Sequence, residues 1–251
     1  MRAFGRDIPI MFALVFWALA WEIVGRAELV FLVPPFTHVL AALAEMVQTG
    51  KFQDATLLTF ESFALGMGLA LLLGIPLGVL MGRVEAAEKL LGTWVNVFVS
   101  APLTALVPVI MILFGLGQTT IVVTVMLFAV WIIVLNTRAG VMQINRSLIE
   151  MARSFGASPF DAFTKIYFWA ALPEILGGVR IGFIRGVKGV IIGQLLISIV
   201  GFGSLFELYA SNFLMKHFWA VLLVLFALSF LIAEFLAWLE RKVEYYASSR
   251  N

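Results

Sequence analysis

Three cations stand in an apolar segment, residues 174–198, that the sequence predicts to cross a membrane as a helix. Arg180 lies near one end, where a long side chain can reach the membrane surface. Arg185 lies roughly 16 Å along the helix from Glu174, at about 1.5 Å per residue, and Lys188 follows one turn later. A charge at this depth is costly unless it faces protein, water or a counter-ion. Arg185 and Lys188 are therefore candidate functional residues.

Two interpretations of Arg185 and Lys188 are open at the level of the sequence. In the first, both line a translocation pathway and favour an anionic or polar substrate. In the second, both form structural ion pairs with acids buried in the protein. The acids considered for such pairs are Glu61, Glu207 and Glu234.

Small residues and prolines mark the same helices. Glycines recur at steps of three and four along 174–198, which lets helix backbones approach closely: Gly178, Gly182, Gly186, Gly189 and Gly193. A second stripe, for which we predict tight packing alone, consists of Gly74, Gly78 and Gly82. Pro102 and Pro108 interrupt residues 88–114, which predicts either a broken helix beside the pathway or a simple kink. Pro102 is therefore a pathway candidate.

The sequence carries no arrangement that predicts catalysis. Gly50-Lys51 is followed by Phe52 and lacks the earlier glycine of a phosphate-binding loop, which needs both backbone amides and lysine. His38 and His217 lie far apart without clustered partners, so no metal site is predicted. There is no cysteine, which excludes disulfides and thiol catalysis. We expect the chain not to be an enzyme and to hold no cofactor of its own.

The composition predicts an all-α polytopic membrane protein. Of the 251 residues, 62% are hydrophobic and 13% charged, against about 25% charged in soluble domains. The mean hydropathy is +1.04. The net charge of +2 comes from scattered cations and does not indicate nucleic-acid binding. Since a span needs about 20 apolar residues, we predict a single transmembrane domain, 1–251, with about six spans at 8–25, 55–82, 88–114, 118–138, 174–198 and 217–239.

The distribution of cations predicts the topology. With the N-terminus inside, eleven cations fall in the inner segments and three, Arg26, Lys51 and Lys216, in the outer ones. Cytoplasmic loops carry such an excess, so both termini are predicted to be cytoplasmic. Residues 1–20 loosely resemble a signal peptide, but an uncleaved first span is the simpler prediction because the next segments are themselves spans.

The longest inner connection, loop 139–173, predicts a compact helix–turn–helix. Leu148, Met151, Ala152 and Phe155 share one face of a short helix. Gly156 stands where a helix ends in the left-handed conformation. A second helix then begins with a capping box, in which Ser158 is the N-cap, Pro159 the first helical residue and Asp161 the reciprocal acid. Pro173 is predicted to end the loop before the fifth span. The first helix offers an apolar stripe to a partner.

Loop 139–173 resembles the signature loop of bacterial ABC importer permeases. That signature reads Glu-Ala-Ala, three residues, Gly, nine residues, Ile, then Leu-Pro, and only Met151 departs from it here. The similarity extends over roughly residues 55–245, and it is closest to the branch that serves nitrate, sulfonates, taurine and pyrimidine vitamin precursors. The resemblance implies that the ATPase-coupling residues are Glu150, Met151, Ala152, Gly156, Ala157, Ser158, Ile166 and Pro173.

The resemblance implies a fold, a mechanism and partners. The fold is the type I importer permease fold, with a coupling helix between spans four and five. A separate ABC ATPase dimer, which binds ATP and Mg, drives transport of a small polar or anionic solute. A second permease copy, an extracytoplasmic substrate-binding protein and membrane lipid complete the partners, in the bacterial inner membrane. In this branch an acid is expected near the middle of the fifth span, where Gln194 stands, so Gln194 joins the pathway candidates.

Two rival functions remain at this stage. A secondary transporter driven by an ion gradient would need buried acids placed as a relay, and Glu22, Glu61 and Glu234 are too scattered for one. A membrane scaffold would bind partners without moving any solute. The sequence identifies neither the substrate nor whether the second permease is an identical chain.

Overall fold

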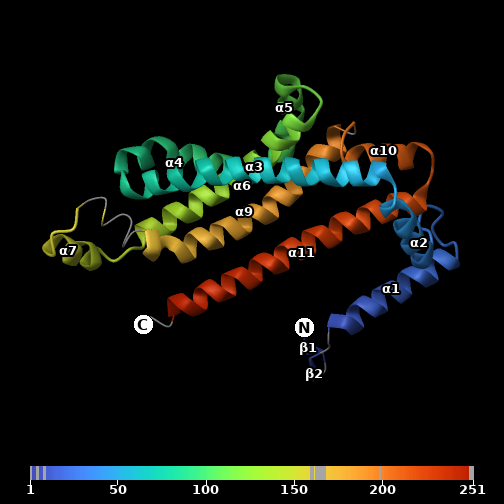
Figure 1. Ribbon diagram of the computed structural model, residues 1–251, viewed down its shortest axis with the longest axis horizontal. Coiled ribbons are helices and arrows are strands. Elements are labelled where there is room, and N and C mark those ends of the chain that lie inside the picture. Colours follow the sequence, from blue (N-terminus) through green and yellow to red (C-terminus); the bar gives the residue numbers. More distant parts are fainter. Residues whose placement is uncertain are drawn as a thin grey trace.

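The computed structural model describes residues 2–3, 6–7, 10–158, 161, 168–197 and 199–248. Apart from a two-stranded antiparallel ribbon near the N-terminus, with two residues in each strand, the regular elements in this part of the chain are helices, as predicted. The elements are β1 (Arg2–Ala3), β2 (Arg6–Asp7), α1 (Ile10–Arg26), α2 (Phe36–Val47), α3 (Gly50–Arg83), α4 (Glu85–Ser100), the 3-10 turn η1 (Leu103–Leu106), α5 (Val107–Phe114), α6 (Gln118–Met142), α7 (Arg146–Ser154), α9 (Phe168–Ile197), α10 (Phe202–Ser211) and α11 (Met215–Ser248) (Figure 1).

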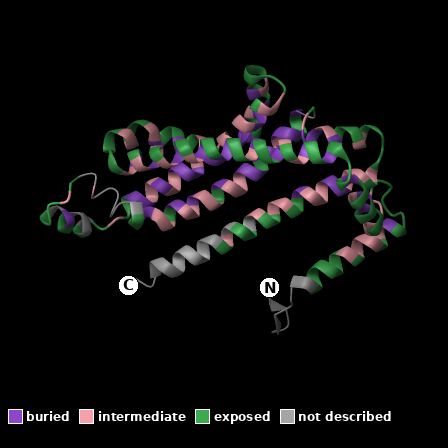
Figure 2. Ribbon diagram, in the orientation of Figure 1, coloured by how far each residue is buried: buried purple, intermediate pink, exposed green. Residues whose placement is uncertain are grey.

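Helices α3, α6 and α9 form a three-helix core, in which α6 packs along both of the others. Glycines make this close approach possible. A Cβ added at Gly78 of α3 would lie 2.6 Å from Thr137 Cβ, and one at Gly182 of α9 would lie 2.7 Å from Ile133 Cγ1. Figure 2 shows the buried residues gathering where these three helices meet, whereas α1 is largely half-buried or exposed. Both predicted glycine stripes therefore serve packing against α6.

The segment predicted as one span at 88–114 is divided. Helix α4 ends at Ser100, Ala101 is extended, and η1 with α5 continues beyond Pro102 at an angle of 96° to α4. Pro102 has no N–H to continue the helix, and Pro108 stands in the first turn of α5, where the missing N–H costs nothing. Of the two alternatives left open by the sequence, the broken helix is the one observed.

Helices α1, α2, α10 and α11 meet at the end of the core away from α7 (Figure 1). Trp21 and Trp219 pack edge to face at 5.2 Å between ring centres. Their indole N–H groups donate to the carbonyls of Pro34 and Leu32, at 3.0 and 2.8 Å. The carboxylate of Glu22 accepts hydrogen bonds from the N–H and hydroxyl of Thr37. These contacts hold the connection between α1 and α2 against α11.

Within the described part of the chain, three helices are long and apolar enough to cross a membrane: α3, α6 and the Met215–Ile232 part of α11. The number rises to five if α4 with α5, and α9 with α10, each count as one bent span. Helix α1 has 17 residues, the short end of the length of about 17–25 residues that spans use. Six spans therefore stay a prediction: among the described residues three to five segments qualify by length and composition.

The structure corrects the predicted start of the fifth span. Pro173 was expected to end loop 139–173, but it lies inside α9, which already begins at Phe168 in the described part of the chain. A proline there removes one backbone hydrogen bond, to the carbonyl of Trp169, near the helix start, where few such bonds precede it. The helix continues because buried residues on either side of the proline, Ala171 and Ile175, pack against Val141 of α6.

Candidate coupling and translocation sites

The two candidate pathway cations lie on α9 outside its packed face. The glycine stripe of α9 faces α6 and α3, where a Cβ at Gly189 would lie 3.1 Å from Val125 Cα. Arg185 is half-buried and Lys188 is exposed. Neither side chain makes a hydrogen bond or an ion pair within the described part of the chain. These two cations of one helix thus have no counter-ion among the residues that the structure describes.

The alternative of structural ion pairs finds no support among the described residues. Glu61, Glu207 and Glu234 are all exposed rather than buried. The carboxylate of Glu61 instead accepts a hydrogen bond from Gln118 at 3.4 Å. Arg185 and Lys188 pair with none of these acids in the single chain.

Gln194 lies in the packing between helices rather than on an open surface. Its side chain is 1% exposed, and Nε2 donates to Thr59 Oγ1 of α3 at 2.8 Å. Thr59 Oγ1 in turn donates to the Ala55 carbonyl at 2.7 Å. A Cβ at Gly203, in the first turn of α10, would overlap the Gln194 carbonyl oxygen. Gln194 therefore joins α9 to α3 and to the start of α10.

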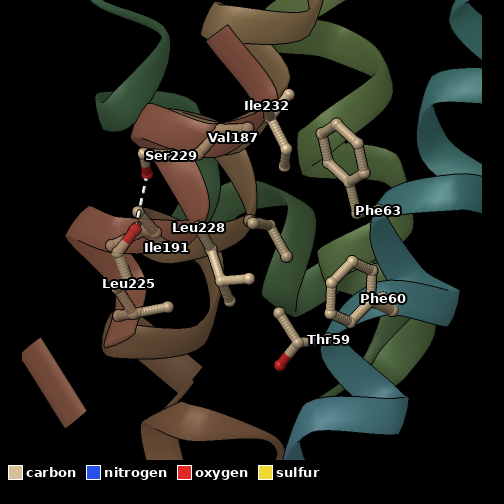
Figure 3. Close-up of a pocket in the computed structure, with 10 residues that line it drawn as sticks. Thr59, Phe60, Phe63, Val187, Ile191, Leu225, Leu228, Ser229 and Ile232 are labelled. Atoms are coloured by element: carbon tan, nitrogen blue, oxygen red, sulfur yellow. Dashed lines mark hydrogen bonds between the residues drawn. The ribbon is translucent and has the colours of Figure 1, made fainter. Parts of the chain in front are cut away.

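An apolar pocket opens next to Thr59, between α3, α9 and α11 (Figure 3). Phe60 and Phe63 line it from α3, and Leu228 lines it from α11. The hydroxyl of Ser229 donates within its own helix, to the Leu225 carbonyl, so it offers little to a polar ligand. Neither candidate cation lines this pocket. Its chemistry suits hydrocarbon and not a polar solute.

Helix α7 protrudes from one end of the core, well separated from α11 and α1 (Figure 1). Two of the four residues predicted to form its apolar stripe are open to a partner, since Met151 is 52% and Phe155 85% exposed. Glu150 is exposed as well, whereas Ala152 is buried. An exposed apolar stripe on a short helix outside the core has the character of a docking surface.

The turn after α7 has the predicted geometry. Gly156 has φ +78°, and the Ala157 N–H donates to the Ala152 carbonyl at 3.0 Å, which closes the helix end. Ser158 Oγ accepts from the Asp161 N–H at 3.1 Å and donates to the Asp161 carboxylate at 2.6 Å. The N-cap pairing of the second helix is thus confirmed. Ile166 and Pro159 lie outside the described residues.

One ion pair that the sequence did not predict joins α4 to α6. Arg138 Nη2 lies 2.5 Å from Glu88 Oε1, and both side chains are mostly buried. The sequence places both charges at inner ends of spans, but only the register between α4 and α6 brings them together. Elsewhere, no group of three metal-ligating side chains occurs among the described residues.

The fold defines a polytopic helical membrane protein from which the short helix α7 protrudes. The family of binding-protein-dependent transport system inner membrane components matches residues 74–245, more than half of the chain. The chain belongs to this family. It is a membrane component and not an enzyme, and the match gives no support to an ion-gradient transporter.

Curated relatives are similar over much of the chain. A putative ABC transporter permease protein of Methanocaldococcus jannaschii is 33% identical over 64% of this chain and 58% of that protein. The taurine transport system permease protein TauC of Escherichia coli is 28% identical over 74% of this chain and 70% of TauC. The bicarbonate transport system permease protein CmpB of Synechocystis is 26% identical over 95% and 89%. The chain thus spans between 58% and 89% of the length of these three relatives.

Two solved structures of the MetNI methionine ABC transporter, both inward-facing, share the fold. Their TM-scores are 0.59 and 0.61, with 24% and 23% sequence identity. The alignments cover 79% and 77% of this chain and 95% and 94% of the matched chains. The predicted importer permease fold is therefore confirmed, and the likeness speaks to fold alone.

Proposed function

We propose that this chain is the membrane-spanning permease of an ATP-driven importer, in which loop 139–173 receives the force of a separate ATPase. The observation that carries the proposal is the pair of exposed apolar side chains on α7, Met151 and Phe155, in a chain of this family. Gly156, in the left-handed conformation, ends this helix. A short helix held at both ends transmits a displacement that an unstructured loop would absorb. Glu150 lies on the same helix, beside the stripe.

The transport cycle follows from two states of the complex. ATP closes an ATPase dimer, loop 139–173 moves with it, and the helices change from inward to outward access. Because ATP can bias the two states only through a difference in binding free energy, the docking contacts of α7 must differ between them. A second copy of this chain and an external substrate-binding protein complete the assembly. ATP and Mg belong to the ATPase.

The proposed substrate is a small polar or anionic solute. Arg185 and Lys188 carry charge on α9 without a counter-ion among the described residues, which suits a pathway that attracts anions. Relatives named for taurine and bicarbonate transport agree with this class. Gln194 and Pro102 are assigned supporting roles: Gln194 fixes α9 against α3, and Pro102 stands at the break between α4 and η1.

The proposed location is a bacterial inner membrane, with both termini and loop 139–173 in the cytoplasm. The chain has no cysteine, so single cysteines report topology without background. Ser154→Cys should react with an impermeant maleimide only in inverted vesicles, and Phe31→Cys, in the connection between α1 and α2, only in right-side-out ones. The opposite pattern would reverse the orientation.

The ATPase is tested by purification of the tagged chain in mild detergent, with the bound proteins identified by mass spectrometry. A P-loop ATPase should accompany the unaltered chain and be lost or uncoupled in Gly156→Trp, which changes the turn without touching the core. Recovery of a folded chain alone would refute ATP-driven transport. The pathway is tested by Arg185→Gln in reconstituted vesicles, where unchanged uptake and selectivity would remove Arg185 from it.

A further inference from the structure

The ion pair between Glu88 of α4 and Arg138 of α6 is largely shielded from solvent, unlike an ordinary surface ion pair. The side chains of Glu88 and Arg138 are 24% and 22% exposed, and their nearest atoms lie 2.5 Å apart. Glu88 Oε2 and Arg138 Nε have no hydrogen-bond partner in the described part of the chain. Desolvating two charges in this way contributes little net stability. A role other than stability therefore needs to be considered.

The carboxylate of Glu88 is held in place by its own helix. A Cβ at Gly92 would lie 2.8 Å from Glu88 Oε1, so only the absence of a side chain there leaves room for the carboxylate. Glu85, in the same first turn, pairs instead with Lys89 on the helix surface, and those side chains are 82% and 74% exposed. Two acids of one turn thus differ: one belongs to an ordinary surface pair, and the other connects two helices.

Arg138 lies close to the point where α7 is attached. It precedes the end of α6 at Met142 by one turn, and residues 143–145 then lead to α7. Asn145 accepts a hydrogen bond from the Ser147 N–H at 3.0 Å, which fixes the start of α7 to this link. Ile144 packs against the cluster around Val141, at the end of the core. A displacement of α7 therefore reaches the last turn of α6.

Helix α4 leads from Glu88 to the break. Near its far end Phe98 stacks on Trp131 of α6, with ring centres 4.4 Å apart and planes at 5°. Beyond Pro102, η1 and α5 pack against α6 and α9 through Leu103, Val107 and Phe128. Ile192 of α9, one turn beyond Lys188, packs on the same cluster. The bent α4–α5 unit thus connects the region of α7 to the region of the pathway cations.

We infer that the Glu88–Arg138 pair transmits the displacement of α7 to α4 and so to α5. Both are positioning residues, since neither contacts the solute or the ATPase in this assignment. The inference rests on the proposed function, because the displacement originates in the ATPase. Without the pair, the first turn of α4 would no longer be tied to the last turns of α6.

The test uses the complex of the full chain with its co-purified ATPase, in lipid nanodiscs. Because the chain lacks cysteine, one environment-sensitive fluorophore can be placed at Ser154→Cys on α7 or at Ile112→Cys on α5, both of which are exposed. ATP should change the emission at both sites. In Glu88→Gln the Ser154 label should still respond, and the Ile112 response should be lost. Glu85→Gln, the matched control in the same turn, should leave both responses intact.

The charge-exchanged chain, Glu88→Arg with Arg138→Glu, separates transmission from folding. It should restore the Ile112 response, and a folded complex in which it does not would overturn the inference. A full Ile112 response in Glu88→Gln would overturn it equally. If Glu88→Gln yields no folded complex, the charge-exchanged chain alone decides. A Ser154 label that is silent in the unaltered complex would instead count against the proposed function, because α7 would then not respond to ATP at all.

Discussion

Glycine occurs in the three-helix core and in loop 139–173 for two different physical reasons. In the core, a Cβ at Gly66 or Gly78 would lie within 2.6 Å of α6, so glycine is needed for space. At Gly156 nothing lies within 4 Å, but φ is +78°, so glycine is needed for backbone conformation. The core glycines therefore leave no room for a side chain. The glycine of the loop leaves room for one, but its positive φ is unfavourable for residues other than glycine. Close packing limits the core, and backbone conformation limits the loop.

The largest effect is expected where volume is added to the core. Gly78→Leu would drive a side chain into Thr137 and the Val134 carbonyl, 2.6 and 2.7 Å from the Cβ position. Overpacking against backbone should lower the free energy of unfolding by about 3 kcal/mol or more. Thermal unfolding followed by size-exclusion chromatography should show little folded protein. The control Gly68→Leu, on the exposed side of the same helix, should fold normally.

Adding a single methyl group at a packed and at an exposed glycine of α3 should have opposite effects on stability. Gly66→Ala places a Cβ 2.6 Å from the Val122 carbonyl, and we expect a loss of about 1–3 kcal/mol. Gly68→Ala meets nothing within 4 Å in a helix interior and should gain about 0.5–1 kcal/mol. Unfolding temperatures of the two variants should therefore move in opposite directions. A shift of both in the same direction would mean that helix propensity, not space, governs these glycines.

A buried polar side chain within the core should matter less for folding than its burial suggests. Gln194→Leu keeps a similar volume, loses the bond to Thr59, and also removes Oε1, which lacks a partner in the described residues. Since removing an unpaired buried polar atom offsets the lost bond, stability should change by less than about 1.5 kcal/mol. The uptake rate of the reconstituted complex should fall clearly, although the free energy of unfolding changes little. If uptake fell only in proportion to the loss of folded protein, Gln194 would be a packing residue and nothing more.

The sequence predicted the local features of both regions well. The turn at Gly156 and the pairing of Ser158 with Asp161 depend on residues a few positions apart, and each was correct. The glycine stripe of α9 was recognised because its spacing follows one helix face. These features are determined by short-range geometry, which the sequence displays directly.

Other features depend on how helices align, and the sequence does not display that. The partnership of Glu88 with Arg138 requires the register of α4 against α6. The 96° bend at Pro102 requires the packing of η1 and α5, since proline alone is compatible with a kink or a break. Pro173 was wrongly expected to end the loop because tertiary packing of α9 outweighs one missing hydrogen bond. The position of Arg185 along its helix could be predicted, but its lack of a counter-ion among the described residues could not.

The smallest effect on the stability of the core is expected at Gly156. Gly156→Ala forces an L-residue into the left-handed region at a cost of about 1–2 kcal/mol, borne by the end of α7 and not by the core. Gly156→Asn should cost less, because asparagine adopts this conformation more readily. The unfolding temperature of the core should stay unchanged in both variants. ATP-dependent uptake should decrease in the order Gly, Asn, Ala, which is the order of left-handed propensity and not of side-chain size. If uptake followed size instead, with Ala above Asn, Gly156 would be a site of close contact with the ATPase, and the contrast between space in the core and conformation in the loop would no longer hold.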